Sequence, residues 1–341
     1  MNNIFIIPKG LSAGVVNSQI VEMVFKLNVL DNKENYIIVH KSDIKKISNP
    51  DAMYDSLFFY LIKQVGIDNI YIRSIFDFIT VFFLKIFFFR KYTIIYDFRG
   101  IINEESYLRN KSAIRKQILF KIEKFIYNKA DRVHTVSNNL KKYLIDNFGY
   151  RSVNVIPCSV STNLLKKVKN KDCIDFVYLG STAVWQKFEE TIKLYGFIEK
   201  RLENSKLTIV TLNQNEAKKI VEKYKIINFE IKSLNHQEVL QDLKNYDFGF
   251  LLRDDNIVNN TASPIKFLEY VSNGVIPIMT DSVGDYSKLV LDEKIGIILK
   301  KDLKIDIKDL EVLLDDEHIH QKMKAFTDKY LWHNVLNDFF E

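Results

Sequence analysis

The stretch RDDNIVNNTASPIKFLEYVSNGVIP, residues 253–277, has the pattern of a short helix set between two apolar strands. Ser263 is a favoured N-cap, and Pro264 suits the first helical position because it lacks only a hydrogen bond that the first turn does not make. The pair Asn273-Gly274 predicts where this helix ends. A strand, a helix and a second strand in this order are typical of a parallel α/β sheet.

The predicted helix carries Lys266 and Glu269 on one side, and most of its remaining circumference is apolar. Such a helix is buried, so its polar side is expected to line a cleft. Unpaired N–H groups near Ile265 and the positive end of the helix dipole suit a phosphate, to which Lys266 adds a full charge. Glu269 can accept two hydrogen bonds from vicinal hydroxyls, such as those of a ribose. An ordinary surface helix with a Lys/Glu pair is the alternative, and spacing alone does not separate the two.

The same alternation of apolar runs and helical patterns extends along the chain, and it predicts, for example, a helix over residues 52–65. A polar, lysine-rich segment, STNLLKKVKNKD (161–172), interrupts the alternation and is the best candidate for a linker. We therefore expect two Rossmann-like doubly wound α/β domains, residues 1–162 and 163–328. The C-terminal helix, 329–341, is expected to pack back toward the first domain. Two such domains imply a cleft between them, which is a favoured place for a ligand.

Composition and charge fit a folded protein of two domains. The chain has 341 residues, of which 47% are hydrophobic and 27% charged, with only 11 Gly and 5 Pro. The net charge of +6 is mild, and basic residues gather on one helix without interleaved stacking aromatics, so nucleic-acid binding is not expected. Cys158 and Cys173 make no disulfide framework, and the start MNNIFIIPKG lacks a signal peptide. These features predict a reducing cytoplasm as the location. No His shows metal-ligand spacing with Cys or carboxylates, so no metal site is expected.

The most apolar segment is IFDFITVFFLKIFFF, residues 75–89. Its length falls short of the roughly 20 residues that a membrane-spanning helix needs, and it contains Asp77 and Lys85. We expect a buried helix of the first domain. A segment that dips into a bilayer surface is the alternative.

Polar residues follow the predicted strand at 92–96, where the sequence is Asp97-Phe98-Arg99-Gly100. Because α/β proteins bind ligands beyond the carboxyl ends of their strands, Asp97 could orient a sugar hydroxyl or act as a base, and Arg99 could hold an acidic group. An Asp/Arg pair that caps the strand end is the alternative. Acceptor-side candidates are Glu104 and Glu105 beyond this strand and Gly14 in the loop after the first strand, where plain turn chemistry is equally consistent.

The helix expected over 107–129 is strongly basic, with Glu123 as its one acidic residue. Its apolar residues recur at helical spacing, which predicts that the basic side faces solvent. That face is either merely solvated or makes peripheral contact with an anionic membrane. The apolar residues concerned are Ile114, Ile118, Leu119, Ile122, Phe125 and Ile126.

Four stretches together resemble the GT-B glycosyltransferases, specifically the retaining family 4 type that builds bacterial surface glycans. They are VHTVSNNLKKYL (133–144), VIPCSV (155–160), FVYLGSTAVWQKFEETIKLY (176–195) and the opening stretch with its S-P-x-K-x-x-E-Y block. The D-x-R-G at residues 97–100, with the Glu pair after it, also resembles a subgroup of these enzymes. The resemblance covers nearly the whole chain and implies two Rossmann-like domains that face each other across a cleft.

The resemblance also implies roles for individual residues. Glu269 matches the glutamate that holds the donor ribose, and Gly180 and Ser181 match the glycine-led loop that faces the diphosphate. Lys187 and Arg253 are the candidates for the basic pair that neutralises the leaving nucleoside diphosphate. Lys266 and the N–H groups near Ile265 would assist, which removes the need for a metal cofactor. Trp185 is expected either to shape the pocket or to belong to the core.

The sequence departs from the family pattern at two places. Thr261 stands where many members carry a second glutamate, which leaves the donor sugar open, and Asp97 stands where many members place a His. The expected activity is transfer of a hexose or N-acetylhexosamine from a nucleotide sugar, such as a UDP-sugar, with retention of configuration. The expected acceptor is a lipid-linked or growing surface glycan at the inner face of the membrane. A nucleotide-sugar epimerase of the same fold, or a non-catalytic transferase-like subunit, are the alternatives.

Overall fold

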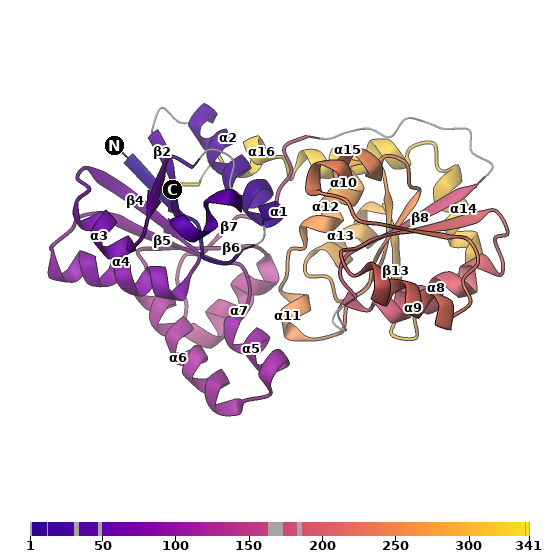
Figure 1. Ribbon diagram of the computed structural model, residues 1–341, viewed down its shortest axis with the longest axis horizontal. Helices are drawn as coiled ribbons and strands as arrows, with labels where there is room; N and C mark the ends of the chain where they lie inside the picture. The colour runs from indigo at the N-terminus through magenta and orange to yellow at the C-terminus, as the bar shows by residue number, and fades with distance from the viewer. Residues whose placement is uncertain are drawn as a thin grey trace. The chain divides into compact units, whose positions relative to one another are not determined.

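The computed structural model describes residues 2–11, 13–30, 34–46, 50–162, 173–182, 186–337 and 339–340. The chain divides into two compact units, Met1–Ser159 with Trp332–Glu341 and Val160–Leu331 (Figure 1). Each unit is a parallel sheet with helices on both faces, so the predicted fold class of two Rossmann-like α/β domains is confirmed. The chain leaves the first unit after Ser159 and returns to it at Trp332. Most of the expected linker, residues 163–172, lies outside the described residues.

The sheet of the first unit has seven strands in the order β3-β2-β1-β4-β5-β6-β7. The order reverses beside β1, which pairs in parallel with β2 on one side and with β4 on the other. The strands are β1 (Asn2–Ile6), β2 (Glu34–His40), β3 (Ala52–Tyr54), β4 (Ile67–Ile72), β5 (Thr93–Phe98), β6 (Arg132–Thr135) and β7 (Asn154–Val155).

Two of the expected helices differ in this unit. The helix expected over 52–65 begins as the edge strand β3, which pairs with β2, and only Leu57–Ile62 is helical. The basic helix expected over 107–129 is two helices, because Lys111 adopts a left-handed conformation with φ of 53° and Ser112 caps the second helix. The helical segments are α1 (Ala13–Val16), η1 (Asn17–Val21), α2 (Glu22–Leu30), η2 (Lys41–Lys46), α3 (Leu57–Ile62), α4 (Ile75–Phe87), α5 (Ile102–Asn110), α6 (Ala113–Lys129), α7 (Asn138–Phe148) and α16 (Trp332–Val335).

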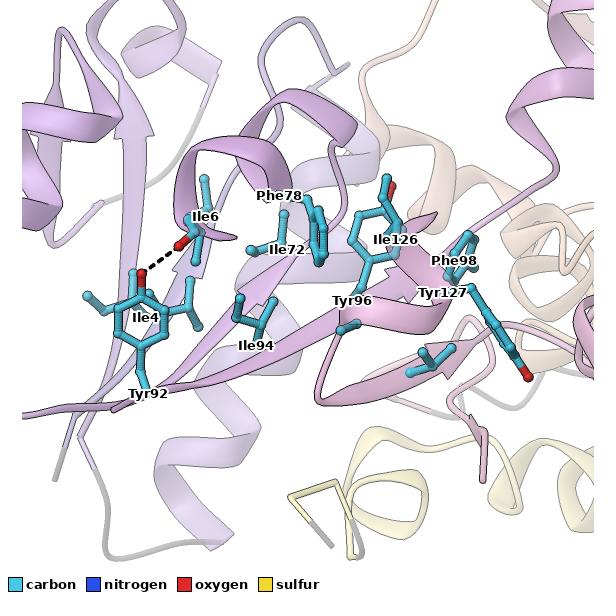
Figure 2. Packing of buried hydrophobic residues seen from close by; sticks show 14 of the residues in the cluster. Ile4, Ile6, Ile72, Phe78, Tyr92, Ile94, Tyr96, Phe98, Ile126 and Tyr127 are labelled. Carbon is cyan, nitrogen blue, oxygen red and sulfur yellow. Dashed lines mark hydrogen bonds between the residues drawn. The ribbon is translucent and has the colours of Figure 1, made fainter. Parts of the chain in front are cut away.

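Successive side chains of the inner strand β5 point to opposite faces of the sheet and contribute to two separate cores. Tyr96 and Phe98 point to the face covered by α4, α6 and α7, where Phe78 and Ile126 pack with them (Figure 2). Ile95 points to the opposite face, which the segments α1 to α2 cover. The C-terminal segment completes this second core with Trp332, Leu336 and Phe339.

The sheet of the second unit has six strands in the order β10-β9-β8-β11-β12-β13. Its order reverses beside β8, which pairs in parallel with β9 and β11. The strands are β8 (Ile174–Leu179), β9 (Ser205–Val210), β10 (Phe229–Lys232), β11 (Phe248–Leu251), β12 (Ile276–Thr280) and β13 (Ile297–Leu299). The helices are α8 (Phe188–Glu199), α9 (Gln214–Lys223), α10 (His236–Leu243), α11 (Ile257–Asn260), α12 (Ile265–Ser272), α13 (Tyr286–Glu293), α14 (Ile307–Asp315) and α15 (Ile319–Asp328).

Candidate nucleotide-binding site

A pocket of about 280 Å³ opens in the second unit, beyond the carboxyl ends of β8 and β9. This is the edge of a doubly wound sheet, at the strand where the order reverses, at which such folds bind ligands. Segments that follow β8, β9 and β10 form one side, and α12 forms the other. The polar lining is Gly180, Ser181, Thr211, Asn213, His236, Lys266 and Glu269.

Helix α12 begins one residue later than expected. Pro264 occupies the N-cap position with extended backbone, and the Ser263 hydroxyl lies 2.9 Å from the hydroxyl of Tyr286. The expected cap by Ser263 is therefore wrong, because its side chain is engaged with another helix. The helix ends at Ser272, and Gly274 follows with φ of 74°, as the pair Asn273-Gly274 predicted.

Burial of the apolar sides of α12 fixes the direction of its polar side. Phe267, Leu268 and Tyr270 are fully buried, and the ring of Tyr270 lies against Gly249 of β11, where a β-carbon would come within 2.7 Å of it. Lys266 and Glu269 consequently face the pocket. The N–H groups of Ile265 and Lys266 stand in the first turn, where no helical carbonyl is available to them. Neither Pro264 nor Ile265 lines the pocket itself.

Gly180 and Lys266 approach each other across the pocket. A β-carbon at residue 180 would lie 3.0 Å from the ammonium nitrogen of Lys266 and 3.0 Å from the hydroxyl of Tyr178. The same ammonium group donates to the side-chain oxygen of Gln186 at 3.2 Å. Glycine is therefore needed for the backbone after β8 to run this close to a buried cation. The neighbouring Ser181 contributes a carbonyl that accepts from Tyr178 at 2.7 Å.

Positive charge concentrates at this end of the pocket. Burial and, to a smaller extent, the nearby Arg253 guanidinium lower the pKa of Lys266 to about 8, while the charge of Glu269 opposes both effects. Burial also lowers the pKa of Arg253. The guanidinium donates to the carbonyl of Leu252, and no described carboxylate forms an ion pair with it. Two neighbouring cations that lack an ion-paired carboxylate favour the binding of an anion.

Glu269 has a partner that the sequence did not suggest. Its Oε1 atom lies 3.6 Å from Nδ1 of His236, and both residues line the pocket. Burial raises the pKa of Glu269, and the charges of His236 and Lys266 oppose that effect. The spacing of the histidines in the sequence assigned no functional role to His236. The sequence did contain a signal for it. His236 begins α10, a few residues after β10 ends, and residues in such a segment lie at the carboxyl edge of the sheet. Thr211 and Asn213 after β9 were missed in the same way.

Lys187 lies outside the pocket lining. It has a left-handed conformation with φ of 51° at the start of α8, and its ammonium nitrogen pairs with Asp254 at 2.7 Å. The side chain is therefore engaged by the residue that follows Arg253. Trp185 lies outside the described residues.

Thr261 is buried, and it does not line the pocket. Its hydroxyl donates to the carbonyl of Ile257 at 2.8 Å, which closes the short helix α11. The segment that follows it is tightly packed, because a β-carbon at Gly284 would lie 1.8 Å from the carbonyl oxygen of Ala262. Thr261 thus serves a structural role in this chain.

The candidates in the first unit need a correction. Asp97 is 1% exposed, and its Oδ2 atom accepts from Arg73 at 2.9 Å, from Arg99 at 2.5 Å and from the hydroxyl of Tyr71. Burial alone would raise the pKa of Asp97, but the two guanidinium groups outweigh it and hold that pKa below its usual value. The side chain of Phe339 packs on Tyr71, beside this cluster. An enclosed carboxylate does not reach a substrate, so the geometry assigns Asp97 to a buried ion cluster rather than to the reaction centre.

The remaining candidates of the first unit lie near its strand ends. Arg99 reaches from Asp97 to the carbonyl of Ile156 at 3.2 Å, and so ties β5 to the segment after β7. Glu104 pairs with Lys116 at 2.8 Å and Glu105 with Arg109 at 3.2 Å, both within the α5 to α6 region. Gly14 lies in α1, where its carbonyl accepts from Ser18. None of these arrangements by itself indicates an acceptor site.

Within the described part of the chain, no group of His, Cys, Asp or Glu side chains is arranged to hold a metal ion.

Comparison with known proteins agrees with the fold. The sequence model of the family described as Glycosyltransferase Family 4 matches residues 34–164. No curated protein sequence matches the chain. Among solved structures, sucrose-phosphate synthase from Thermosynechococcus elongatus aligns with a TM-score of 0.73 at 14% identity, over 98% of this chain and 96% of that chain.

Two further structures share the fold over nearly their whole length. The lipopolysaccharide outer core galactosyltransferase WaaB aligns with a TM-score of 0.66 at 12% identity, over 99% of this chain and 98% of that chain. A putative UDP-N-acetylglucosamine 2-epimerase from Listeria monocytogenes aligns with a TM-score of 0.61 at 13% identity, over 98% and 94%. At these identities the likeness establishes the fold.

The two parallel sheets and the similar solved structures establish the GT-B fold for this chain. The match to the glycosyltransferase family model falls within the first unit apart from the last few matched residues.

Proposed function

We propose that this chain is a glycosyltransferase that moves a hexose or N-acetylhexosamine from a UDP-sugar to a lipid-linked or growing surface glycan, with retention of anomeric configuration. The observation that carries the proposal is the meeting of Lys266 and Glu269, from one buried helix, with Gly180 across a single pocket. A nucleoside diphosphate can use these groups in turn. The cation and the backbone turn suit its phosphates, and the carboxylate suits its ribose hydroxyls.

The donor binds in this proposal with its diphosphate at the start of α12. Lys266, Arg253 and the first-turn N–H groups face the phosphate oxygens, and the backbone at Gly180 and Ser181 closes the other side. The ribose hydroxyls donate to Glu269, beside His236. Lys187 joins the phosphate site only if the donor displaces Asp254. Side chains thereby supply the positive charge, so the proposal includes no metal.

The reaction exchanges one glycosidic bond for another. The bond from the anomeric carbon to the diphosphate oxygen breaks, and a bond to the acceptor oxygen forms on the same face of the sugar. The acceptor hydroxyl proton leaves with the diphosphate, whose growing charge is stabilised by Lys266 and Arg253. Because that charge exceeds the charge of the ground state, the two cations favour the transition state over the bound donor.

The acceptor and the location belong to the proposal as well. Among the similar structures, WaaB is a lipopolysaccharide galactosyltransferase, which supports a surface glycan as the acceptor class. Such acceptors are assembled at the inner face of the membrane, and we place the enzyme there. The identity of the sugar stays open, because Thr261 replaces the residue that would otherwise constrain it.

A donor and acceptor screen tests the proposal. The purified chain is incubated with UDP- and GDP-sugars, with and without lipid-linked and soluble glycan acceptors, and products are analysed by mass spectrometry and by proton NMR, which reports anomeric configuration and epimerisation. The expected result is free UDP together with a glycan heavier by one sugar, with the donor's anomeric configuration kept. An epimerised nucleotide sugar formed without acceptor would instead identify an epimerase. UDP binding without turnover of any donor would identify a non-catalytic subunit.

A further inference from the structure

Helix α4 of the first unit leaves a strongly apolar face uncovered. Its buried face packs on the sheet through Val81, Leu84 and Phe78, of which Figure 2 shows Phe78. The sequence predicted that the helix is buried, but Phe76 is 81% exposed and Phe87 is 66% exposed. The exposed apolar residues recur at helical spacing and therefore form one stripe, which consists of Phe76, Ile79, Phe83, Ile86 and Phe87. Phe88 and Phe89 extend it beyond the helix end.

The stripe continues onto the neighbouring helix α6. Phe82 of α4 and Phe125 of α6 meet edge to face with ring centroids 5.5 Å apart. A hollow of about 330 Å³ between the helices is lined by apolar side chains and by Lys121. The sequence predicted that the basic side of this segment faces solvent, and the apolar residues Ile114, Ile118 and Phe125 are exposed as well. We call the exposed stripe of α4 together with Ile114, Ile118 and Phe125 the α4–α6 surface.

The charges around the α4–α6 surface are mostly positive. Arg115 and Lys121 are exposed and flank the stripe of α6 on its two sides, and Lys91 is exposed after α4. The nearby carboxylates are engaged elsewhere. Asp131 pairs with Lys85 at 2.5 Å, and Glu123 is buried where it accepts from the backbone N–H groups of α5. Asp77 is the acidic residue of α4 itself, and burial raises its pKa to about 6.

We propose that the α4–α6 surface binds an anionic lipid bilayer, with the Phe and Ile side chains in the interface and the flanking basic residues against the lipid headgroups. Aromatic and aliphatic residues on one face with Lys and Arg beside them are the features of segments that lie in a bilayer interface. Within the described residues no helix is long and apolar enough to cross a membrane, so α4 lies on the bilayer.

A second copy of the chain fits this surface less well. In a twofold dimer the same patch faces itself, so the Arg115 and Lys121 of one copy would approach those of the other without intervening carboxylates. An anionic bilayer would instead place negatively charged headgroups against these basic residues. The inference deepens the membrane location given in the proposed function and rests on it for the choice of a bilayer; the surface itself belongs to the first unit, whereas the nucleotide pocket lies in the second.

Vesicle flotation of the full chain tests the inference. The chain is mixed with phosphatidylcholine vesicles that contain or lack phosphatidylglycerol, at low and high salt. Binding is expected only to the anionic vesicles, and it should decrease as salt rises. The double variant Phe83→Ser/Phe87→Ser and the double variant Arg115→Glu/Lys121→Glu should each lose most of this binding. The matched control, Ile227→Ser/Val312→Ser, changes two comparably exposed apolar residues of the second unit and should bind as the unchanged chain does.

Three outcomes would overturn the inference: no binding to anionic vesicles, equal binding of the Phe83→Ser/Phe87→Ser variant, or a dimer in solution that this variant dissociates. UDP affinity is measured on every variant and should not change. Unchanged UDP affinity shows that a variant has folded, and it separates a failure at this surface from a failure of the proposed nucleotide site.

Discussion

The Nδ1 atom of His236 lies 3.6 Å from Oε1 of Glu269, and this pair links the start of α10 to the middle of α12 across the pocket of the second unit. The pair matters because Glu269 is only 6% exposed and its surroundings favour the neutral acid. A neighbouring imidazole and the Lys266 ammonium favour the carboxylate, which is the form that accepts hydrogen bonds from a ribose. The pocket therefore has an acceptor group at Glu269 and a cation at Lys266, and Arg253 lies near Lys266 without lining the pocket.

Nucleotide binding should weaken at alkaline pH. Lys266 has a pKa of about 8, so it is a cation below that pH and neutral above it. The diphosphate binds the cation better, and the UDP dissociation constant should therefore rise above pH 8, by up to about tenfold per pH unit. Isothermal titration calorimetry from pH 7 to pH 9.5 measures this, in steps of ~0.5 pH unit. Lys266→Arg keeps its charge over that range, and a decline of equal size in that variant would show that another group titrates.

A side chain at residue 180 should block the pocket. The methyl group of Gly180→Ala would lie 3.0 Å from the Lys266 ammonium nitrogen, so the lysine must move from its place. We expect UDP affinity to fall by at least about tenfold, which is ~1.4 kcal/mol. Combining Gly180→Ala with Lys266→Ala relieves the contact, and the two losses should then be smaller together than their sum. Strict additivity would mean that the two residues do not interact.

Asp97 is expected to matter for stability rather than for nucleotide binding. Asp97→Asn leaves Arg73 and Arg99 without their carboxylate in a buried position, which should cost about 3–5 kcal/mol of unfolding free energy. Urea unfolding at neutral pH measures the loss, and UDP affinity of the folded variant should stay unchanged. A stable variant that binds UDP normally but transfers no sugar would restore the catalytic role that the sequence suggested.

Asp77 should make stability depend on pH in the acidic range. Its pKa is raised by burial from the ordinary 3.8 to about 6, so the folded state holds the proton more tightly than the unfolded state does. This contribution is fully present below pH 3.8 and is lost as pH rises through 6. The difference in unfolding free energy between the unchanged chain and Asp77→Asn should therefore shift over that window, in favour of the variant at the higher pH. A constant difference from pH 4 to pH 7 would contradict it.

Local signals in the sequence predicted the parts of the fold that depend on neighbouring residues. The end of α12 at Asn273-Gly274 is one such signal, and the spacing that puts Lys266 and Glu269 on one side of the helix is another. Both follow from backbone geometry within a few residues. The start of α12 was predicted one residue too early. Ser263 bonds to Tyr286 of a distant helix instead of capping α12.

Features that depend on distant residues could not be predicted. The burial of Asp97 depends on Arg73 and Tyr71 of the adjacent strand and on Phe339 near the C-terminus. The strand β3 forms only because β2 offers an edge to it. The periodicity of the basic segment indicated an apolar face, but it could not show that Ile114, Ile118 and Phe125 stay exposed while Ile126 is buried. An apolar stripe has the same spacing whether a core or a bilayer covers it.

The central claim is that the pocket of the second unit binds a nucleoside diphosphate through Glu269 and Lys266. Calorimetric titration of UDP into the unchanged chain, Glu269→Gln and the exposed-site control Glu222→Gln tests it most directly. We predict binding by the unchanged chain and the control, and a loss of about 1.5–3 kcal/mol in Glu269→Gln because hydrogen bonds to a charged acceptor are lost. Equal UDP affinity in all three proteins, or no binding by the unchanged chain, would contradict the claim.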